Sequence, residues 1–253
     1  MSVFSVGTVL SRTFSTFFKH PFVFIGLSLL SQVAGFIINL VLGFAGETIA
    51  AIAILAAAFL ILITQGAVAY GVYETLRGNA AQFSKSLSRG LARIIPLTLG
   101  VLLFYIALAL VFALGAIGVA VAGLAFGFLA AVVIIALPLA LLAAILFFKW
   151  IVFVPACVVE GLGPVKSLSR SSELTDGCRL KIVALYLMGF TVLSIVFFVT
   201  ALSTHIHPVF TIVELIVDAI PIAFLNVMTA VIYYELRSVK EGVSIESLTS
   251  VFD

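Results

Sequence analysis

Long runs without a charged residue alternate with short polar segments along this chain. The first two uncharged runs cover residues 21–46 and 48–73, and only Glu47 separates them. An α-helix needs about 20 apolar residues to cross a hydrocarbon core of about 30 Å. Each run therefore predicts one membrane-spanning helix, and the two together predict a helical hairpin.

The stretch from Ile94 to Phe148 contains no charged residue. As a single helix with a rise of about 1.5 Å per residue, it would be roughly 80 Å long and would far exceed a bilayer. We expect the glycine-rich segment 115–127 to form a turn, which gives spans near 95–116 and 122–148. Two later runs predict spans over 182–202 and 209–234, so the pattern predicts six spanning helices.

The composition agrees with a membrane protein and excludes several soluble classes. Apolar residues make up 64% of the chain and charged residues only 9%, against about 45–50% and 25% in soluble domains. This excludes a water-soluble enzyme, a DNA-binding domain and a disordered tail, and we expect no nucleic-acid partner. The two cysteines lie in segments expected in the cytoplasm, where thiols stay reduced. No cofactor is predicted.

The positions of the basic residues predict the orientation. All 13 Lys and Arg residues lie before the first span, between spans two and three, between spans four and five, or after span six. With six spans, these segments share one side of the membrane, which the positive-inside rule assigns to the cytoplasm. We therefore expect a multi-pass protein of the bacterial inner membrane with both termini cytoplasmic. Its basic segments are expected to contact membrane lipids, including anionic head groups.

A short amphipathic segment precedes each pair of spans. Residues 2–19 carry apolar positions at intervals of three or four, which predicts a helix lying in the membrane interface. The pentapeptide at 85–89 recurs unchanged at 166–170, and 8–12 is its first, looser copy. The chain is therefore interpreted as one all-α membrane domain of three parallel repeats with pseudo-threefold symmetry. The repeats cover residues 1–78, 79–161 and 162–253.

Glutamates recur in step with these segments, one at the cytoplasmic end of each even-numbered span. We predict that they form ion pairs with the arginines of the interfacial helices and hold those helices against the spans. Alternatively, they are ordinary solvated helix ends. The residues concerned are Glu74, Glu160 and Glu235, and Arg12, Arg89 and Arg170.

Two motifs resemble a known family. Residues 154–177 read VPACVVEGLGPVKSLSRSSELTDG, and residues 234–242 read YELRSVKEG. They resemble the membrane domain of some glycerophosphoryl diester phosphodiesterases and the related YciC-like bacterial membrane proteins. The resemblance implies an inner-membrane protein of this broad group, without the separate soluble barrel that carries catalysis in those enzymes. Pro164 and Gly177 suit the start and the end of a short interfacial helix over 164–176.

Two acids stand inside the sixth span, toward the outer side. Glu214 and Asp218 lie one helical turn apart, and acids at this depth face a partner or a polar cavity. Span one offers a polar stripe that includes Gln32 and Asn39, and span two adds Thr64 and Gln65. We expect the stripe of span one to face the two acids inside the bundle.

Three interpretations of this cluster remain open. It is a buried hydrogen-bonded group with at least one acid protonated, or a polar route for a cation, proton or head group, or a metal site. The metal site would use His205, His207, Glu214 and Asp218, but the His-x-His spacing is a weak signal.

No catalytic motif accompanies these features. No Walker motif, CxxC pair or catalytic triad is present, and no nucleophile lies beside a base. The sequence favours a non-enzymatic integral membrane protein, with a role in envelope or lipid homeostasis implied by the family resemblance alone. The alternative is a transporter or channel for a small polar solute, cation or lipid that uses the outer acids. The sequence indicates neither a protein partner nor an oligomeric state.

Overall fold

The computed structural model describes residues 4–44, 47–204 and 210–242, and every regular element in these ranges is an α-helix. Six of the ten helices are long and apolar enough to cross a membrane. The predicted all-α class and the six spans are thus confirmed. The helices are α1 (Val6–Lys19), α2 (Pro21–Phe44), α3 (Glu47–Leu76), α4 (Phe83–Ala92), α5 (Ile94–Phe126), α6 (Phe128–Lys149), α7 (Phe153–Val159), α8 (Pro164–Thr175), α9 (Arg179–Thr204) and α10 (Phe210–Glu241).

The long helices pack in sequence as three hairpins, α2–α3, α5–α6 and α9–α10. Each predicted span coincides with one long helix. The sixth continues to Glu241, beyond the predicted end at residue 234. In these additional turns Glu235 pairs with Arg12 of α1 and Glu241 pairs with Arg170 of α8. Leu236 is buried, and the helix becomes exposed at Lys240 and Glu241.

The turn between the third and fourth spans lies at Gly127, so the predicted limits 95–116 and 122–148 were wrong at this end. Gly127 has a φ of +82°, which glycine adopts without steric penalty. Gly115 and Gly118 lie inside α5 and face α6. A Cβ atom on Gly115 would lie 2.1 Å from Leu139. These two glycines therefore permit close helix packing and do not form a turn.

Each hairpin is preceded by one short helix, α1, α4 or α8, at the three predicted positions. Helix α8 begins at Pro164 and is followed by Gly177 with a φ of +74°. In α1, Val9 is completely buried, whereas the side chains of Phe14 and Phe18 are 51% and 67% exposed. One face of α1 thus packs on the protein while aromatic rings project from the other.

An unpredicted break separates α6 from α7 at residues 150–152. The Lys149 carbonyl accepts hydrogen bonds from the hydroxyls of Ser171, at 3.0 Å, and Thr175, at 3.2 Å. The backbone N–H of Val152 donates to Ser171 Oγ at 3.2 Å. Hydroxyls of α8 thus replace the backbone bonds that the helix loses at the break.

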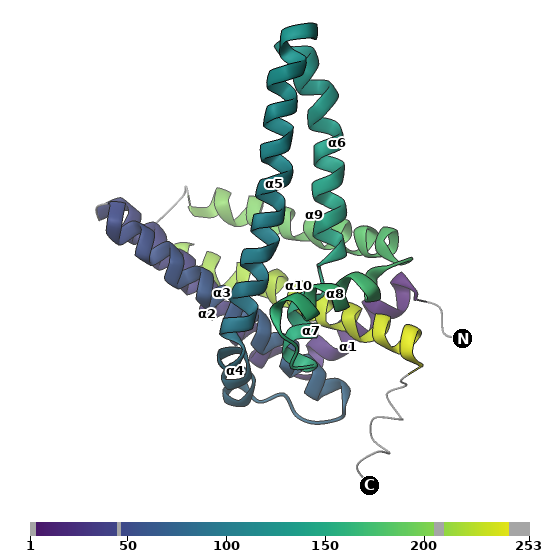
Figure 1. Ribbon diagram of the computed structural model, residues 1–253. Coiled ribbons are helices and arrows are strands. Elements are labelled where there is room, and N and C mark those ends of the chain that lie inside the picture. Colours follow the sequence, from purple (N-terminus) through teal and green to yellow (C-terminus); the bar gives the residue numbers. More distant parts are fainter. Residues whose placement is uncertain (1–3, 45–46, 205–209, 243–253) are drawn as a thin grey trace.

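The three hairpins leave a common base in different directions (Figure 1). The α5–α6 hairpin diverges from the other two, and the short helices α1, α4, α7 and α8 gather at the base. The largest buried cluster includes Leu27 of α2, Ile182 of α9 and Val231 of α10, together with Val152 of the break after α6. Phe148 of α6 packs against this cluster. The protein core therefore lies at the base, and the outer parts of α5 and α6 are largely exposed.

Candidate functional site: a central cavity between the hairpins

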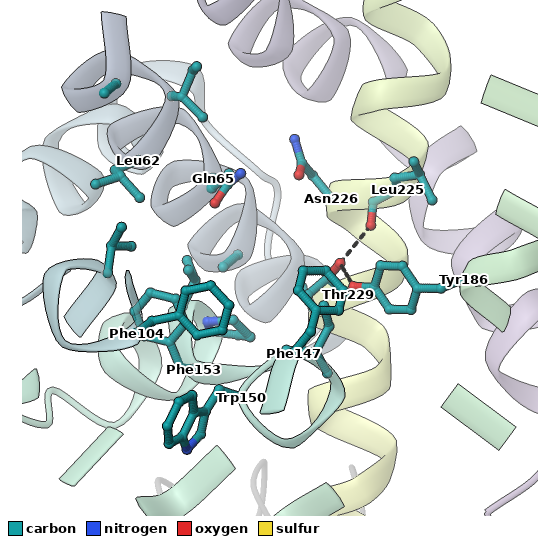
Figure 2. A pocket seen from close by; sticks show the side chains of 18 of the residues that line it. Leu62, Gln65, Phe104, Phe147, Trp150, Phe153, Tyr186, Leu225, Asn226 and Thr229 are labelled. Carbon is teal, nitrogen blue, oxygen red and sulfur yellow. Dashed lines mark hydrogen bonds between the residues drawn. The ribbon is translucent and has the colours of Figure 1, made fainter. Parts of the chain in front are cut away.

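A cavity of about 460 Å³ lies where the three hairpins meet. This volume is within the range of about 300–1,000 Å³ found for small-molecule sites. Its walls come from α3, α5, α6, α7, α9 and α10, so no single hairpin forms it. Figure 2 shows aromatic rings along one side and polar side chains on α3 and α10. The residues that define its character are Gln65, Phe104, Trp150, Tyr186, Asn226 and Thr229.

Three lining residues occupy matching positions relative to the recurring glutamates. Gln65, Ile151 and Asn226 precede Glu74, Glu160 and Glu235 by the same number of residues. Helix α3 contributes Gln65 and helix α10 contributes Asn226. Ile151 comes from the non-helical segment between α6 and α7. The cavity is therefore lined by equivalent positions from the three even-numbered spans, two of which carry a carboxamide.

The two carboxamides extend into the space between α3 and α10 (Figure 2). Within the described ranges, neither the Gln65 side chain nor the Asn226 side chain has a hydrogen bond to another residue. An unsatisfied amide at membrane depth costs free energy, because hydrocarbon offers no hydrogen bonds. Both side chains are only partly buried, so their free donors and acceptors are available to a molecule in the cavity.

A hydroxyl pair lies beside these carboxamides. Thr229 Oγ1 donates to the Leu225 carbonyl at 2.9 Å, so its proton is already used. The Tyr186 hydroxyl therefore donates to Thr229 Oγ1, and both bonds are drawn in Figure 2. This pair links α9 to α10 and leaves acceptor lone pairs of both oxygens unused.

A constriction of small residues closes the cavity toward the base. Ala69, Pro155 and Ala230 line both the cavity and a second, much narrower space below it. These three residues again precede the glutamates by equal numbers of residues. The narrow space is lined by Tyr73 and Tyr234, among others, and has no room for a water molecule. The cavity is thus sealed from the base by matching segments of α3, α7 and α10.

Ion pairs surround this closed end. Arg12 of α1 pairs with Glu235 of α10, and Arg170 of α8 pairs with Glu160 at 3.0 Å. The structure thus places two predicted arginines against two predicted glutamates. Arg170 thus contacts the glutamate that follows the α5–α6 hairpin, and Arg12 of the first short helix contacts the glutamate near the end of the last long helix.

The third pair was predicted wrongly. Glu74 forms its ion pair with Lys85 at 3.2 Å, whereas the Arg89 guanidinium lies 5.4 Å from the centroid of the Tyr70 ring. Lys85 lies one helical turn before Arg89 on the same helix, and of these two basic residues it is Lys85 that contacts Glu74. Its hydrogen bond with Glu74 raises the pKa of Lys85. Lys85 belongs to the short helix that follows Glu74 in the chain, just as Arg170 belongs to the short helix that follows Glu160. The third ion pair therefore connects the same kinds of segment as the Arg170 pair.

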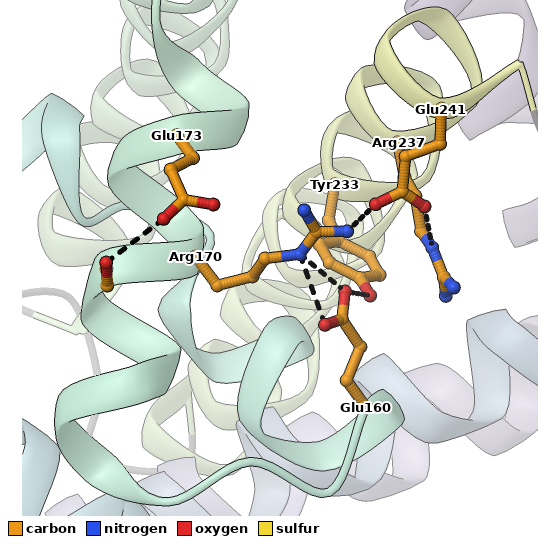
Figure 3. Close-up of polar contacts among 7 residues, drawn as sticks. Glu160, Arg170, Glu173, Tyr233, Arg237 and Glu241 are labelled. Atoms are coloured by element: carbon orange, nitrogen blue, oxygen red, sulfur yellow. Dashed lines mark hydrogen bonds and ion pairs between the residues drawn. The ribbon is translucent and has the colours of Figure 1, made fainter.

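Glu160 is the centre of the most extensive of these networks (Figure 3). The single N–H of Arg170 Nε donates to both carboxylate oxygens of Glu160, at 3.0 and 3.1 Å, and the Tyr233 hydroxyl donates to one of them at 2.7 Å. Arg170 also pairs with Glu241, which in turn binds Arg237 at 2.7 Å. The network joins α7, α8 and α10 and so fixes the wall that carries Pro155.

A small residue follows each of the three arginines, and all three are buried. They are Thr13, Gly90 and Ser171. At Gly90 a Cβ atom would lie 2.3 Å from the Ile63 carbonyl oxygen, so α4 packs directly on the backbone of α3. This close approach fixes the position of the α3 backbone at Ile63, two residues before the cavity residue Gln65.

The outer acids are not part of the cavity lining. Asp218 is buried, and its carboxylate accepts a hydrogen bond from the Thr200 hydroxyl of α9 at 3.0 Å. The expected partner was the polar stripe of α2. Although α2 packs on α10, the hydrogen bond found here comes from span five. Glu214 and Gln32 are half-buried.

The predicted metal site cannot be assembled from the described residues. His205 and His207 lie outside the described ranges, as does the side chain of Asn39. Within these ranges no group of three His, Cys, Asp or Glu side chains could hold a metal ion. The metal hypothesis therefore stays a prediction.

Comparisons with known proteins match no family model, no curated protein and no solved structure. The resemblance to the phosphodiesterase membrane domain and the YciC-like proteins thus stays a prediction, and the geometry of the site has to support any function by itself. Gln65 was noticed in the sequence as a polar residue of span two, but Asn226 was not. The signal that relates Gln65 to Asn226 is their equal spacing from Glu74 and Glu235 in the sequence.

Proposed function

We propose that this chain is a non-enzymatic, multi-pass protein of the bacterial inner membrane that binds a lipid in its central cavity. A contribution to envelope or lipid homeostasis follows from this binding role. The observation that carries the proposal is the cavity itself, since its apolar and aromatic walls lie within the spanning helices. A molecule that enters from the membrane meets a surface suited to acyl or prenyl chains.

The lining supports binding rather than catalysis. Apart from tyrosine hydroxyls, the described lining residues include no titratable side chain. General acid–base catalysis uses a group whose pKa is near the working pH, most often His, Asp, Glu or Lys. Nucleophilic catalysis needs an activated Ser, Cys or Lys beside a base. Neither arrangement is available to a molecule held in the cavity.

The proposal includes three parallel repeats around an axis through the cavity. The ion pairs of Arg12, Lys85 and Arg170 support it, because each connects a segment to the preceding repeat. The matching positions of Gln65 and Asn226 support it independently. The repeat limits remain 1–78, 79–161 and 162–253, and the axis runs along the membrane normal.

In this arrangement α1, α4 and α8 lie in the cytoplasmic interface. Exposed aromatic side chains, including Phe14, Phe18 and Phe22, would enter the lipid layer beside the basic residues. Both termini are then cytoplasmic, and anionic head groups are the expected neighbours of the basic segments.

Transport through the outer acids is the alternative. Asp218 is held by Thr200, and neither Asp218 nor Glu214 lines the cavity. The paired substitution Glu214→Gln with Asp218→Asn should therefore leave lipid occupancy unchanged. Loss of an ion flux in proteoliposomes on the same substitution would favour transport instead.

The decisive experiment fills the cavity. Ala58 is an exposed residue that lines the cavity, so Ala58→Phe should displace a bound lipid while the protein still folds. Ala109 of α5 is exposed and lies outside the cavity lining, which makes Ala109→Phe the matched control. Native mass spectrometry of the full chain should show lipid adducts on the wild type and on Ala109→Phe, and few on Ala58→Phe. Equal adducts on all three proteins would contradict the proposal.

A further inference from the structure

The character of the polar groups in the cavity identifies the class of lipid. Gln65 and Asn226 provide neutral donors and acceptors, and Tyr186 and Thr229 add hydroxyl oxygens. The described lining residues include no Lys, Arg, His, Asp or Glu. A phosphate or carboxylate in this low-dielectric space would lose its hydration without gaining a counter-charge, which is strongly unfavourable.

The free carboxamides are complementary to an uncharged oxygen-bearing head. Each offers two N–H donors and one carbonyl acceptor, and within the described ranges neither is bonded to another residue. A hydroxyl can donate to one carboxamide and accept from the other, and an ester or ketone carbonyl can accept from both. Both carboxamides extend into the same space between α3 and α10 (Figure 2).

The remaining wall suits a hydrocarbon chain. Phe104 of α5, Phe147 of α6 and Phe190 of α9 line the cavity, and their rings give a chain large contact areas without polar competition. Below the carboxamides, the constriction of Ala69, Pro155 and Ala230 stops the cavity before it reaches the charged base. The head therefore stays among the carboxamides and does not reach the ion pairs.

We propose that the cavity binds a neutral lipid through its uncharged head, with Gln65 and Asn226 donating to and accepting from its hydroxyl or carbonyl oxygens. This inference rests on the proposed lipid-binding function and names its ligand class. Acylglycerols and isoprenoid alcohols share this chemistry, and the experiment separates the two sources.

Lys149, a basic residue next to the cavity, is where a charged lipid head would bind instead of a neutral one. Lys149 precedes the lining residue Trp150, with Nζ 5.7 Å from the indole centroid. It is half-buried and is not itself a lining residue. A lipid phosphate at the rim would use Lys149, whereas a neutral head inside the cavity would not.

The test measures lipid binding to the purified full chain in detergent, with dioleoylglycerol, farnesol or dioleoylphosphatidylglycerol as the added lipid. Gln65→Leu and Asn226→Leu remove the hydrogen bonds and nearly conserve side-chain volume. Each should weaken binding of the preferred neutral lipid about fivefold, since one such bond contributes about 1 kcal/mol. Gln32→Leu is the matched control, because Gln32 lies on α2 outside the cavity lining. Binding to Gln32→Leu and Lys149→Gln should be unchanged.

The outcomes separate this inference from the proposed function. Preference for phosphatidylglycerol, with binding lost in Lys149→Gln and kept in Gln65→Leu, would overturn the neutral-head assignment. If Ala58→Phe still abolished that binding, the lipid-binding function would stand. Absence of binding by all three lipids, together with no effect of Ala58→Phe on co-purified lipid, would overturn both.

Discussion

At the residue scale, Glu160 should contribute more to stability than any solvated carboxylate of the same region. It accepts a bifurcated hydrogen bond from Arg170 Nε and a second bond from the Tyr233 hydroxyl, and its side chain is only 16% exposed. We expect Glu160→Gln to lower the free energy of unfolding by about 1.5–3 kcal/mol, the range for hydrogen bonds that involve a charged group. Equilibrium unfolding of the full chain in detergent micelles measures this change.

Glu173 is the control for this substitution. It is exposed on α8, and its carboxylate accepts a hydrogen bond from the Ser169 hydroxyl at 3.1 Å. Glu173→Gln should change stability by less than about 0.5 kcal/mol, as is usual for surface positions. Equal losses for the two variants would show that the network around Glu160 is no stronger than a solvated pair.

Residue-level patterns in the sequence predicted which charges matter but not every partner. The recurrence of Glu74, Glu160 and Glu235 was visible, and two arginine partners follow from it. Lys85 and Arg89 lie one turn apart on the same short helix, so spacing alone could not decide which of them reaches Glu74. That choice depends on how far α4 tilts across α3, which is a tertiary property.

At the element scale, the contact of α4 with α3 should depend on Gly90. Alanine has a higher helix propensity than glycine by about 1 kcal/mol, so propensity alone predicts that Gly90→Ala is stabilising. A Cβ atom there would instead meet the Ile63 carbonyl oxygen at 2.3 Å, and backbone cannot rotate away. We expect a net loss of about 1–3 kcal/mol, as for overpacked sites, seen as a lower thermal midpoint in detergent.

Gly7 is a control position, a glycine of another short helix without the clash. A Cβ atom on Gly7 would meet only Ser5 Oγ, at 3.8 Å, within helix α1. Gly7→Ala should therefore leave the thermal midpoint unchanged or raise it. A rise in both alanine variants would refute the close packing of α4 on α3.

The ends of the helices could be predicted where polar residues mark them. The prediction failed where no polar residue marks the end. The ends of α2, α3 and α9 follow charges or prolines in the sequence. Between Ile94 and Phe148 there is no such mark, and several glycines are equally suited to a turn. Gly127 forms the turn, while Gly115 is needed where Leu139 packs. Which glycine has which role depends on the register of α5 against α6, and no local pattern contains that register.

At the scale of the whole molecule, the cavity could not be located before the hairpins were placed. Gln65 and Asn226 are far apart in sequence, and each alone reads as an isolated polar residue in an apolar span. Their equal spacing from Glu74 and Glu235 relates them only if the three units are superposed. The sequence therefore contained the equal spacing, whereas the divergence of the hairpins that creates the cavity is a property of packing.

The orientation of the whole molecule is testable from the two ends of one hairpin. Asn79 lies in the exposed connection before α4, and Leu124 lies near the tip of α5 with 92% of its surface exposed. With Cys157 and Cys178 replaced by Ser, Asn79→Cys should resist a membrane-impermeant thiol reagent added to intact cells and react after lysis. Leu124→Cys should react in intact cells, because the six-span arrangement puts the tip of α5 on the outer side. The reverse pattern would invert the orientation, move the ion pairs of Arg12 and Arg170 to the outer face, and place the base of the cavity there as well.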